Sequence, residues 1–419
     1  MEKKRPIRIL VTDNQPLAPL VAGARLRIYH LYRNLARHFV ITYVGAYDWL
    51  GPPHRERGVA PNFTEITVPL AWLHFRLNSI IQRFVGREML LDVTMPLLRN
   101  YAPRFAEVLN RHTKDAQIII ISRPWVFPYV EWRRDQLLIY DAHNCESVAK
   151  KDILGDSLVG RLLADKVTKI EGQLCRVSRL IFACSEEDRN QFIDTYGIEE
   201  DKILIIPNGV DVGQIRPASQ AERETAKREI GMNGKKTILF VGSWNKPNAE
   251  SVEFIVKVLA PQLLEYQFLI VGGAQQAYLR LATGSTHTIP VNVRFFGTVD
   301  EPLRDTIYRA SDIALNPMFT GSGTNIKMLD YMAAGLPVIT TPRGARGIEA
   351  PHHTFVICKA SDFAMSIKMI LENEEMHNAL RQNGRKLVEV KFDWKLIAEK
   401  AYSVIEAYLG QGSRPDLLV

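Results

Sequence analysis

Short apolar runs alternate along the chain with longer stretches in which apolar residues recur at helical spacing. Such alternation is typical of parallel sheets covered by helices on both faces. In the first half it predicts buried strands at 7–12, 39–44, 118–122, 137–140, 180–184 and 203–206. In the second half it predicts strands at 237–241, 268–271, 293–296, 313–315, 338–340 and 355–357. The sequence therefore predicts an α/β protein built from two Rossmann-like domains.

The pattern is interrupted once, after the sixth predicted strand. Pro207 opens the segment Pro-Asn-Gly-Val-Asp, and a polar, charge-rich stretch then continues to Lys236, where a new strand pattern begins. Proline and glycine in such a stretch favour a connection rather than a helix or strand. We therefore expect domains over residues 1–208 and 209–395, followed by a helix over 396–419.

Residues 68–101 have a different pattern, in which large apolar residues alternate with arginines such as Arg76, Arg83 and Arg87. The spacing predicts an amphipathic helical insertion in the first domain. Packing of this helix on its own domain is the favoured interpretation. Contact with a membrane surface or a lipid-linked acceptor is the alternative.

Composition narrows the class of protein. No run of eighteen apolar residues is present, and no signal-peptide core follows the charged N-terminus, so we expect a cytoplasmic protein. The four cysteines stand singly, which favours neither a disulfide framework nor a zinc site. A net charge of +7 fits polyanionic partners, such as nucleotide diphosphates or acidic lipids, but it also fits solubility alone.

Residues 321–335 carry the strongest chemical signal. The small residues at their start let backbone N–H groups approach an anion, and 326–334 is predicted to be a helix with its positive end at that loop. Lys327 lies in the first turn, where a cation is disfavoured unless an anion is bound. Asp330, one turn later, can accept hydrogen bonds from the two adjacent hydroxyls of a ribose. The alternative is an ordinary capped surface helix.

Two further positions follow predicted strands. His143 lies after the strand at 137–140, where a histidine is more often a structural hydrogen-bonding residue than a catalyst, although ligands of α/β proteins bind at this edge of the sheet. Gly23 lies between the first strand and the next helix, where a tight turn needs a glycine anyway. The neighbouring Arg25 and Arg27 are expected to meet an acidic acceptor or to be solvated.

These motifs resemble the retaining GT-B glycosyltransferases of family 4, also known as glycosyl transferases group 1. The family's donor motif has an acidic residue, a glycine-rich loop, a second acidic residue and a Gly-x-Pro-Val ending. Asp330 matches the second acidic residue and Gly335 begins the ending. Ser322 stands at the first acidic position, so the loop resembles instead a subgroup with Gly-x-Gly-Thr-x-x-Lys.

The resemblance covers nearly the whole chain and suggests a role for each region. It implies a GT-B fold, with two parallel-sheet domains facing across a cleft, an N-terminal acceptor domain and a C-terminal donor domain. It implies that the last helix, after Phe392-Asp393-Trp394, returns to the first domain. The segment Asp-x-His-x-x-Glu that contains His143 resembles one whose histidine hydrogen-bonds the donor sugar or the reacting phosphate.

The resemblance also implies a set of site residues. The catalytic candidates are His143 and Lys327. Candidates for binding the donor are Gly23, Gly242, Lys246, Ser322, Gly323, Thr324, Asn325 and Asp330. With an acid absent from position 322, Ser322, Thr324 and the loop amides would substitute for it.

The implied activity is transfer of a hexose, with retention of configuration, from a UDP-, GDP- or ADP-sugar to a glycan, a lipid-linked or a small-molecule acceptor, with no nucleic acid partner. No Asp-x-Asp spacing occurs in the chain, so positive side chains rather than a metal are expected to balance the diphosphate. The context is expected to be polysaccharide biosynthesis, with the protein peripheral at the inner face of the plasma membrane. A GT-B-like epimerase or phosphorylase, and a non-catalytic basic protein that binds membrane or nucleic acid, are the alternatives.

Overall fold

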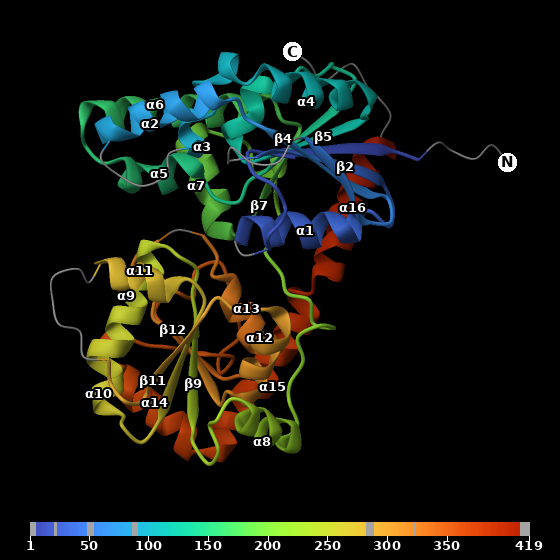
Figure 1. The fold of residues 1–419 in the computed structure, drawn as a ribbon. Coiled ribbons are helices and arrows are strands. Elements are labelled where there is room, and N and C mark those ends of the chain that lie inside the picture. Colours follow the sequence, from blue (N-terminus) through green and yellow to red (C-terminus); the bar gives the residue numbers. More distant parts are fainter. Residues whose placement is uncertain are drawn as a thin grey trace. The chain divides into compact units, whose positions relative to one another are not determined.

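The computed structural model describes residues 6–20, 23–47, 54–85, 91–281, 289–321 and 323–410, and its ribbon is drawn in Figure 1. The chain divides into two compact units. Unit 1 comprises residues 1–207 together with 397–419, and unit 2 comprises 208–396. Each is a separate α/β unit with its own sheet and its own core.

Unit 1 contains a sheet of eight strands in the order β3-β4-β2-β1-β5-β6-β7-β8. The strands are β1 (Arg8–Asp13), β2 (Val40–Tyr47), β3 (Arg55–Ala60), β4 (Phe63–Pro69), β5 (Ile118–Ser122), β6 (Leu137–Asp141), β7 (Leu180–Ala183) and β8 (Ile203–Ile205). The helices are α1 (Gly23–Leu35), α2 (Trp72–Val85), α3 (Leu91–Thr94), α4 (Pro103–Asp115), α5 (Glu146–Leu154), α6 (Leu158–Val177) and α7 (Glu186–Tyr196).

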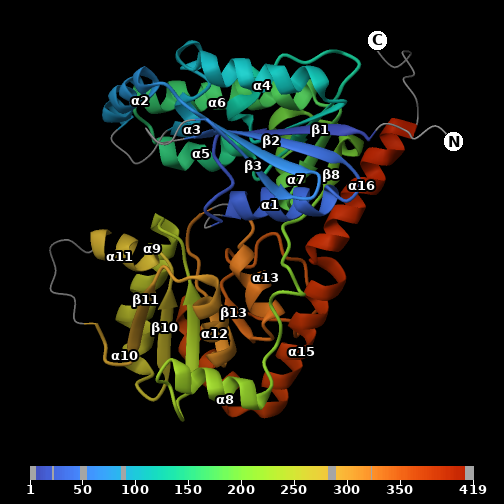
Figure 2. The same ribbon diagram turned by 45° about the vertical axis from the view of Figure 1, so that its right-hand side comes forward.

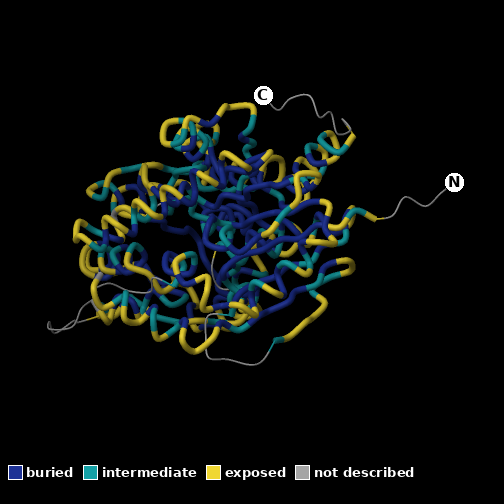
Figure 3. The backbone as a smooth tube through the Cα atoms, turned by 90° about the horizontal axis from the view of Figure 1, so that it is seen from above, coloured by how far each residue is buried: buried dark blue, intermediate teal, exposed yellow. Residues whose placement is uncertain are grey.

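Helices cover both faces of this sheet, with α4 and α6 on one face and α1 on the other (Figures 1 and 2). The central strands are apolar on both faces because both faces are covered, and all five residues of β5 are buried. Figure 3 colours the backbone by exposure and shows buried stretches mainly toward the interior and exposed stretches mainly toward the outside. The apolar runs of the sequence thus correspond to the middle of the sheet.

The edge of this sheet differs from the prediction. Neither β3 nor β4 was predicted, and β3 pairs antiparallel with β4, so the sheet is not wholly parallel. β3 is a mostly exposed edge strand that begins Arg-Glu-Arg. β4 contains the buried Glu65, which forms an ion pair with Arg57 and accepts a hydrogen bond from the N–H of Leu17. Because these charged residues interrupt the apolar pattern, a search for apolar runs does not identify either strand. Val68 and Pro69 end β4, and the helical part of 68–101 begins at Trp72.

Unit 2 contains a parallel sheet of six strands in the order β11-β10-β9-β12-β13-β14. The strands are β9 (Thr237–Val241), β10 (Gln267–Val271), β11 (Val293–Gly297), β12 (Ile313–Asn316), β13 (Val338–Thr340) and β14 (Val356–Ile357). The helices are α8 (Gln220–Glu229), α9 (Lys246–Phe254), α10 (Ala260–Gln262), α11 (Ala274–Leu281), α12 (Glu301–Ala310), α13 (Ile326–Ala333), α14 (Phe363–Glu372) and α15 (Glu374–Lys391).

The core of unit 2 lies in two layers, one on each face of the sheet. Residues of α12, α13 and α15 pack on one face, and residues of α9, α11 and α14 pack on the other. The predicted fold class, two α/β domains with parallel sheets between helices, is confirmed apart from the antiparallel β3.

The last helix, α16 (Trp394–Gly410), follows α15 and belongs to unit 1 from Ile397 onward. Lys400 donates to the carbonyl of Ile205 at 2.9 Å, and Tyr402 stacks on His38 with ring centroids 3.9 Å apart. These contacts attach the C-terminal helix to the edge of the first sheet. No helix in the described ranges is long and apolar enough to cross a membrane.

Candidate functional site

In unit 2, the loop at 321–325 connects strand β12 to helix α13. Gly321 and Gly323 have φ angles of 100° and 80°, a region that glycine occupies without strain. Asn325 is the N-cap residue of α13, but its side chain makes no capping hydrogen bond and instead donates to the carbonyl of Gly344 at 3.2 Å. Asn325 therefore leaves the positive end of α13 without the usual N-cap hydrogen bond, and this end can receive an anion.

Lys327 lies in the first turn of α13 and is only partly exposed. Its ammonium donates to Oδ1 of Asn248 at 2.6 Å and lies 4.5 Å from the centre of the Phe240 ring. Burial lowers the pKa of this ammonium to about 7. Across the described ranges no carboxylate pairs with it. Lys327 is a cation held in place by a neutral amide and an aromatic ring, without an acid to neutralise it.

Asn248, which the sequence did not single out, connects this lysine to the loop after β9. Its side-chain nitrogen donates to the carbonyl of Ser243 at 3.0 Å, while its oxygen accepts from Lys327. Gly242 lies at the same turn, where a Cβ would come 2.9 Å from Ala274 Cβ and 3.0 Å from Asn248 Cγ. The turn at 242–243 can pack this closely against the starts of α9 and α11 only because residue 242 has no side chain.

Asp330 lies one turn after Lys327. Burial raises the pKa of its carboxyl to about 7, although the charge of Arg304 and a hydrogen bond from Tyr308 oppose the rise. A buried carboxyl with a strongly raised pKa is a frequent mark of a binding site. The geometry leaves Asp330 able to accept hydrogen bonds when it is ionised.

The remaining candidates of unit 2 differ in environment. The hydroxyl of Thr324 is buried and has no hydrogen-bond partner in the described part of the chain, so it is available to a ligand. Lys246, the first residue of α9, is 74% exposed and lies 3.7 Å from Glu250. Ser322 lies outside the described residues. The structure thus places Gly242, Thr324, Asn325, Lys327 and Asp330 on the segments around α13, with Lys246 pointing to solvent.

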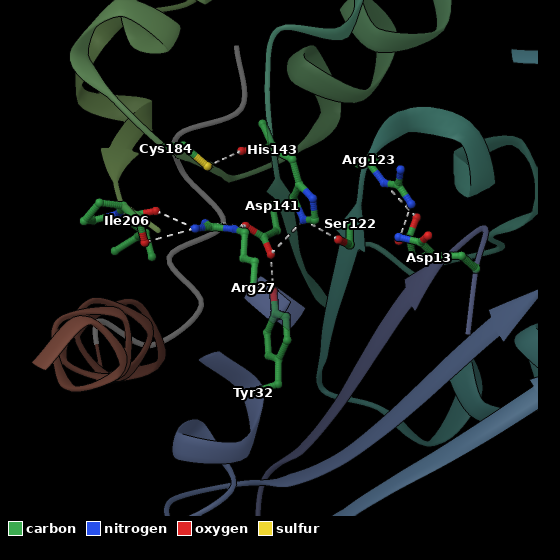
Figure 4. Close-up of polar contacts among 12 residues, drawn as sticks. Asp13, Arg27, Tyr32, Ser122, Arg123, Asp141, His143, Cys184 and Ile206 are labelled. Atoms are coloured by element: carbon green, nitrogen blue, oxygen red, sulfur yellow. Dashed lines mark hydrogen bonds and ion pairs between the residues drawn. The ribbon is translucent and has the colours of Figure 1, made fainter. Parts of the chain in front are cut away.

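In unit 1, polar side chains gather at the carboxyl ends of neighbouring strands, and Figure 4 shows Asp13, Asp141 and His143 among them. Asp141 ends β6 and is fully buried. Its carboxylate accepts two hydrogen bonds from Arg27, at 2.7 and 3.0 Å, and one from Tyr32 at 2.8 Å. Arg27 also donates to the carbonyls of Ile206 and Pro207. The expectation that Arg27 is solvated or meets an acceptor is therefore wrong, because its guanidinium is buried and bonded to Asp141 and to two backbone carbonyls.

His143 lies two residues after this strand and is buried. Its Nε2 shares a 2.9 Å hydrogen bond with the hydroxyl of Ser122 and lies 3.9 Å from Asp141. Burial, with the charges of Arg123 and Arg27, holds the pKa of His143 well below its usual value, so the ring is neutral near pH 7. Its Nδ1 is buried and has no hydrogen-bond partner among the residues that the structure describes. A fixed, neutral imidazole with one free nitrogen suits hydrogen bonding to a substrate.

Next to this histidine, Arg123 joins the ends of β5 and β1. It donates to both carboxylate oxygens of Asp13, at 3.2 and 2.6 Å, and to Oδ1 of Asn14 at 2.8 Å (Figure 4). Arg123 has a φ of 67°, a left-handed conformation that costs a non-glycine residue energy and often marks a functional position. The sequence showed no pattern that could have identified it.

Gly23, the other candidate of unit 1, is the exposed first residue of α1. It lies in the same unit as His143, whereas the donor-binding candidates other than Gly23 belong to unit 2. Within the described part of the chain, no group of three or more His, Cys, Asp or Glu side chains is placed to hold a metal ion.

Two family profiles match the chain. The profile described as Glycosyltransferase Family 4 matches residues 21–214, and the one described as Glycosyl transferases group 1 matches 235–373. The first match falls almost entirely in unit 1 and the second falls in unit 2.

Among curated proteins, a phosphatidyl-myo-inositol mannosyltransferase of Mycobacterium tuberculosis is 28% identical over 220 residues. That alignment covers 50% of this chain and 55% of the relative, so the chain spans about half the length of this curated relative.

Among solved structures, sucrose-phosphate synthase from Thermosynechococcus elongatus aligns with a TM-score of 0.72 at 17% identity, covering 97% of this chain and 100% of the other. HepE of Anabaena, in complex with UDP-glucose, aligns with a TM-score of 0.67 at 14% identity, covering 96% and 100%. At these identities the likeness concerns the fold. The two profiles and the shared two-sheet fold together show that this chain belongs to the group 1 glycosyltransferases and has their GT-B fold.

Proposed function

We propose that this protein transfers a hexose from a nucleotide diphosphate sugar to an acceptor hydroxyl, with retention of configuration. In this proposal unit 2 binds the donor and unit 1 binds the acceptor. Family membership supports the reaction class, and retention follows from the resemblance to retaining members. The anomeric carbon exchanges its bond to the diphosphate for a bond to the acceptor oxygen.

The observation that carries the proposal is the environment of Lys327. A partly buried ammonium without a carboxylate partner, at the uncapped start of a helix, is unfavourable by itself and favourable once an anion binds. A diphosphate fits this position. The same charge would stabilise the leaving nucleotide diphosphate as its bond to the sugar breaks.

The other candidates take roles around that anion. Asp330 would accept hydrogen bonds from the ribose hydroxyls, and Thr324, Asn325 and the amides near Gly323 would contact the phosphates or the sugar. The free Nδ1 of His143 would hydrogen-bond the transferred sugar or the reacting phosphate oxygen. Ser322, Gly242 and Lys246 complete the proposed donor site of unit 2, and Gly23 is a proposed donor contact supplied by unit 1.

A UDP-, GDP- or ADP-sugar is the proposed donor, and the neighbour HepE was crystallised with UDP-glucose. Because Lys327 and the helix end supply positive charge, we propose that the reaction needs no metal. Activity that survives excess chelator is the expected result. A requirement for added magnesium would contradict this part of the proposal.

The test is a thermal-shift screen with UDP, GDP, ADP and TDP, followed by an assay of nucleotide release with and without acceptor. A transferase releases nucleotide faster when acceptor is added. An epimerase would instead isomerise the donor without acceptor, and a non-catalytic protein would do neither. Lys327→Ala should weaken donor binding strongly, whereas the matched Lys257→Ala, which removes an exposed lysine paired with Glu253, should not. Equal donor binding by Lys327→Ala would refute the donor site.

We also propose that unit 1 contacts the cytoplasmic face of a membrane through α2. Trp72 and Phe84 on this helix are 57% and 70% exposed, and Arg76 and Arg83 accompany them. Exposed aromatic and aliphatic side chains beside arginines suit an anionic lipid surface. A curated relative is a mannosyltransferase whose name specifies a phosphatidyl lipid, which is consistent with a lipid-linked acceptor.

Sedimentation with vesicles tests this contact. Phosphatidylglycerol vesicles should carry the wild-type protein into the pellet, and Phe84→Glu should weaken that binding. Met365→Glu is the matched control, because Met365 is 68% exposed but lies in unit 2. Equal sedimentation of both variants with wild type would exclude α2 as the membrane contact.

A further inference from the structure

Beside His143, unit 1 contains a cluster of charged side chains that the roles above do not use. It consists of Asp13, Asp92, Arg123, Glu146 and Lys150. These residues come from the ends of β1 and β5 and from helices α3 and α5. β1, β5 and β6 are neighbours in the parallel sheet, so the cluster lies at the carboxyl edge where α/β proteins bind ligands.

Four members of the cluster are paired with one another. Arg123 holds Asp13 through two hydrogen bonds, and Lys150 forms an ion pair with Asp92. Lys150 also lies 5.4 Å from the ring centre of the buried Trp125. The charges of these two pairs cancel, so the fifth member decides the net charge of the cluster.

Glu146 is that fifth member, and it is 4% exposed. Throughout the described ranges, no hydrogen bond or ion pair reaches its carboxyl group. Lys150, Arg123, Glu171 and Asp92 are near enough to act on its charge, and burial raises its pKa to about 7. A buried, unpaired carboxyl costs stability, which suggests that it is kept for a ligand.

A capping role does not explain Glu146. It is the first residue of α5, where an acid commonly neutralises the free N–H groups of a helix. Here the buried Glu171 of α6 already accepts from the N–H groups of Glu146 and Ser147, both at 2.8 Å. Glu146 therefore stands beside an occupied cap, and the negative charge of Glu171 opposes its ionisation.

We infer that Glu146 and Arg123 form the acceptor subsite of unit 1 and bind the hydroxyl groups of an uncharged polyol ring, such as a sugar or an inositol. The ionised carboxylate accepts hydrogen bonds from neighbouring hydroxyls, and the guanidinium donates to them. With the other charges cancelled, an ionised Glu146 leaves the cluster one unit negative, which disfavours a phosphate at this position. The inference rests on the proposed transferase function, because it supplies the acceptor of that reaction.

Saturation-transfer NMR tests the subsite with three neutral probes, myo-inositol, glucose and glycerol, and with D-inositol 3-phosphate as the charged probe. The protein is full-length and carries the nucleotide found in the thermal-shift screen. We expect transfer to at least one neutral polyol and weaker transfer to the phosphorylated ring. Glu146→Gln should weaken the binding of the polyol about tenfold or more, because a hydrogen bond to a charged group is lost. The control Glu131→Gln removes an exposed carboxyl, 69% exposed, and should change nothing.

The pH dependence provides a second measurement. Lys150 and Arg123 have raised pKa values and stay charged, so between pH 6 and 8 the ionisation of Glu146 should strengthen polyol binding several-fold. In Glu146→Gln the affinity should not vary with pH. A raised or unchanged melting temperature at pH 8 will show that this variant is folded.

The inference is overturned if no neutral polyol binds, if Glu146→Gln binds polyols as wild type does, or if D-inositol 3-phosphate binds better than myo-inositol. Failure of the proposed function has a different result, since the wild-type protein would then bind no nucleotide in the preceding screen. Nucleotide binding that is intact in Glu146→Gln separates loss of the acceptor subsite from loss of the donor site.

Discussion

Donor binding should move protons in two opposite directions, because Lys327 and Asp330 both have pKa values of about 7 in the free protein. A diphosphate favours charged Lys327, so its binding takes up a proton. A ribose that donates two hydrogen bonds favours ionised Asp330, so its binding releases one. Near pH 7 the two effects should nearly cancel in the wild-type protein.

The magnitude follows from the shifts. The pKa of Lys327 falls from 10.5 to about 7, which corresponds to a penalty of at most about 5 kcal/mol on the charged form. Partial exposure reduces that figure. About half of the lysines are neutral at pH 7 and about 99% at pH 9, so donor affinity should fall by up to about 50-fold between these values. Asp330 changes affinity by only about twofold over the same range, because it is already half ionised at pH 7.

Two variants separate the opposing contributions. Asp330→Asn keeps the lysine and should take up about half a proton per donor bound at pH 7. Lys327→Met keeps the aspartate and should release about half a proton. Lys327→Met should still fold, because it removes a cation that burial penalises.

Calorimetry in PIPES and imidazole buffers measures these protons, because the apparent binding enthalpy changes with the ionisation enthalpy of the buffer. A nucleotide sugar is the suitable ligand, since its diphosphate does not itself titrate near pH 7. The reasoning is refuted if Asp330→Asn shows no buffer dependence, or if the donor affinity of the wild-type protein is the same at pH 7 and pH 9. Lys257→Met should behave as wild type.

Three further changes have defined outcomes. The pKa of Glu146 is raised from 4.5 to about 7, so its contribution to stability is greatest below pH 4.5 and is lost as the pH rises through about 7. Glu146→Gln should therefore raise the free energy of unfolding at pH 8 by up to about 3 kcal/mol. Urea unfolding measures this difference. Arg27→Met leaves Asp141 buried and unpaired and should cost about 3–5 kcal/mol, while the double variant with Asp141→Asn should recover much of that loss. Asn248→Ala removes the hydrogen bond that positions Lys327 and should weaken donor binding about 5- to 10-fold in calorimetry, with a lack of effect excluding this positioning role.

The two sheets could be predicted because their central strands are covered on both faces. Such strands must be apolar along their whole length, as β5 is, and that pattern can be read locally. The edge strands β3 and β4 could not be found in the same way. The strand β3 is largely exposed. Glu65 can be buried inside β4 because it pairs with Arg57 and accepts a hydrogen bond from the N–H of Leu17, and neither partner is adjacent to it in sequence.

Some features of the proposed donor segment, residues 321–335, can be read from the sequence. The glycines and the order of Lys327 and Asp330 along α13 are local features, and the chemistry of an anion at a helix start follows from them. The family resemblance added Gly242, although its reason is a tertiary one, since only the packing of residues 240, 248 and 274 leaves no room for a Cβ. Asn248 was missed because an asparagine near a helix start ordinarily suggests a cap.

By itself the sequence determined the apolar strands, the break after Pro207 and the helix start that carries Lys327, because each depends on neighbours in the chain. Only the tertiary structure decided which charges are paired. Arg27 pairs with Asp141, which is 114 residues away in sequence, and Arg123 pairs with Asp13, which is 110 residues away. The carboxyl of Glu146 has no partner within the described residues. The electrostatic state of a side chain depends on burial and on groups brought together by folding, and local sequence contains neither.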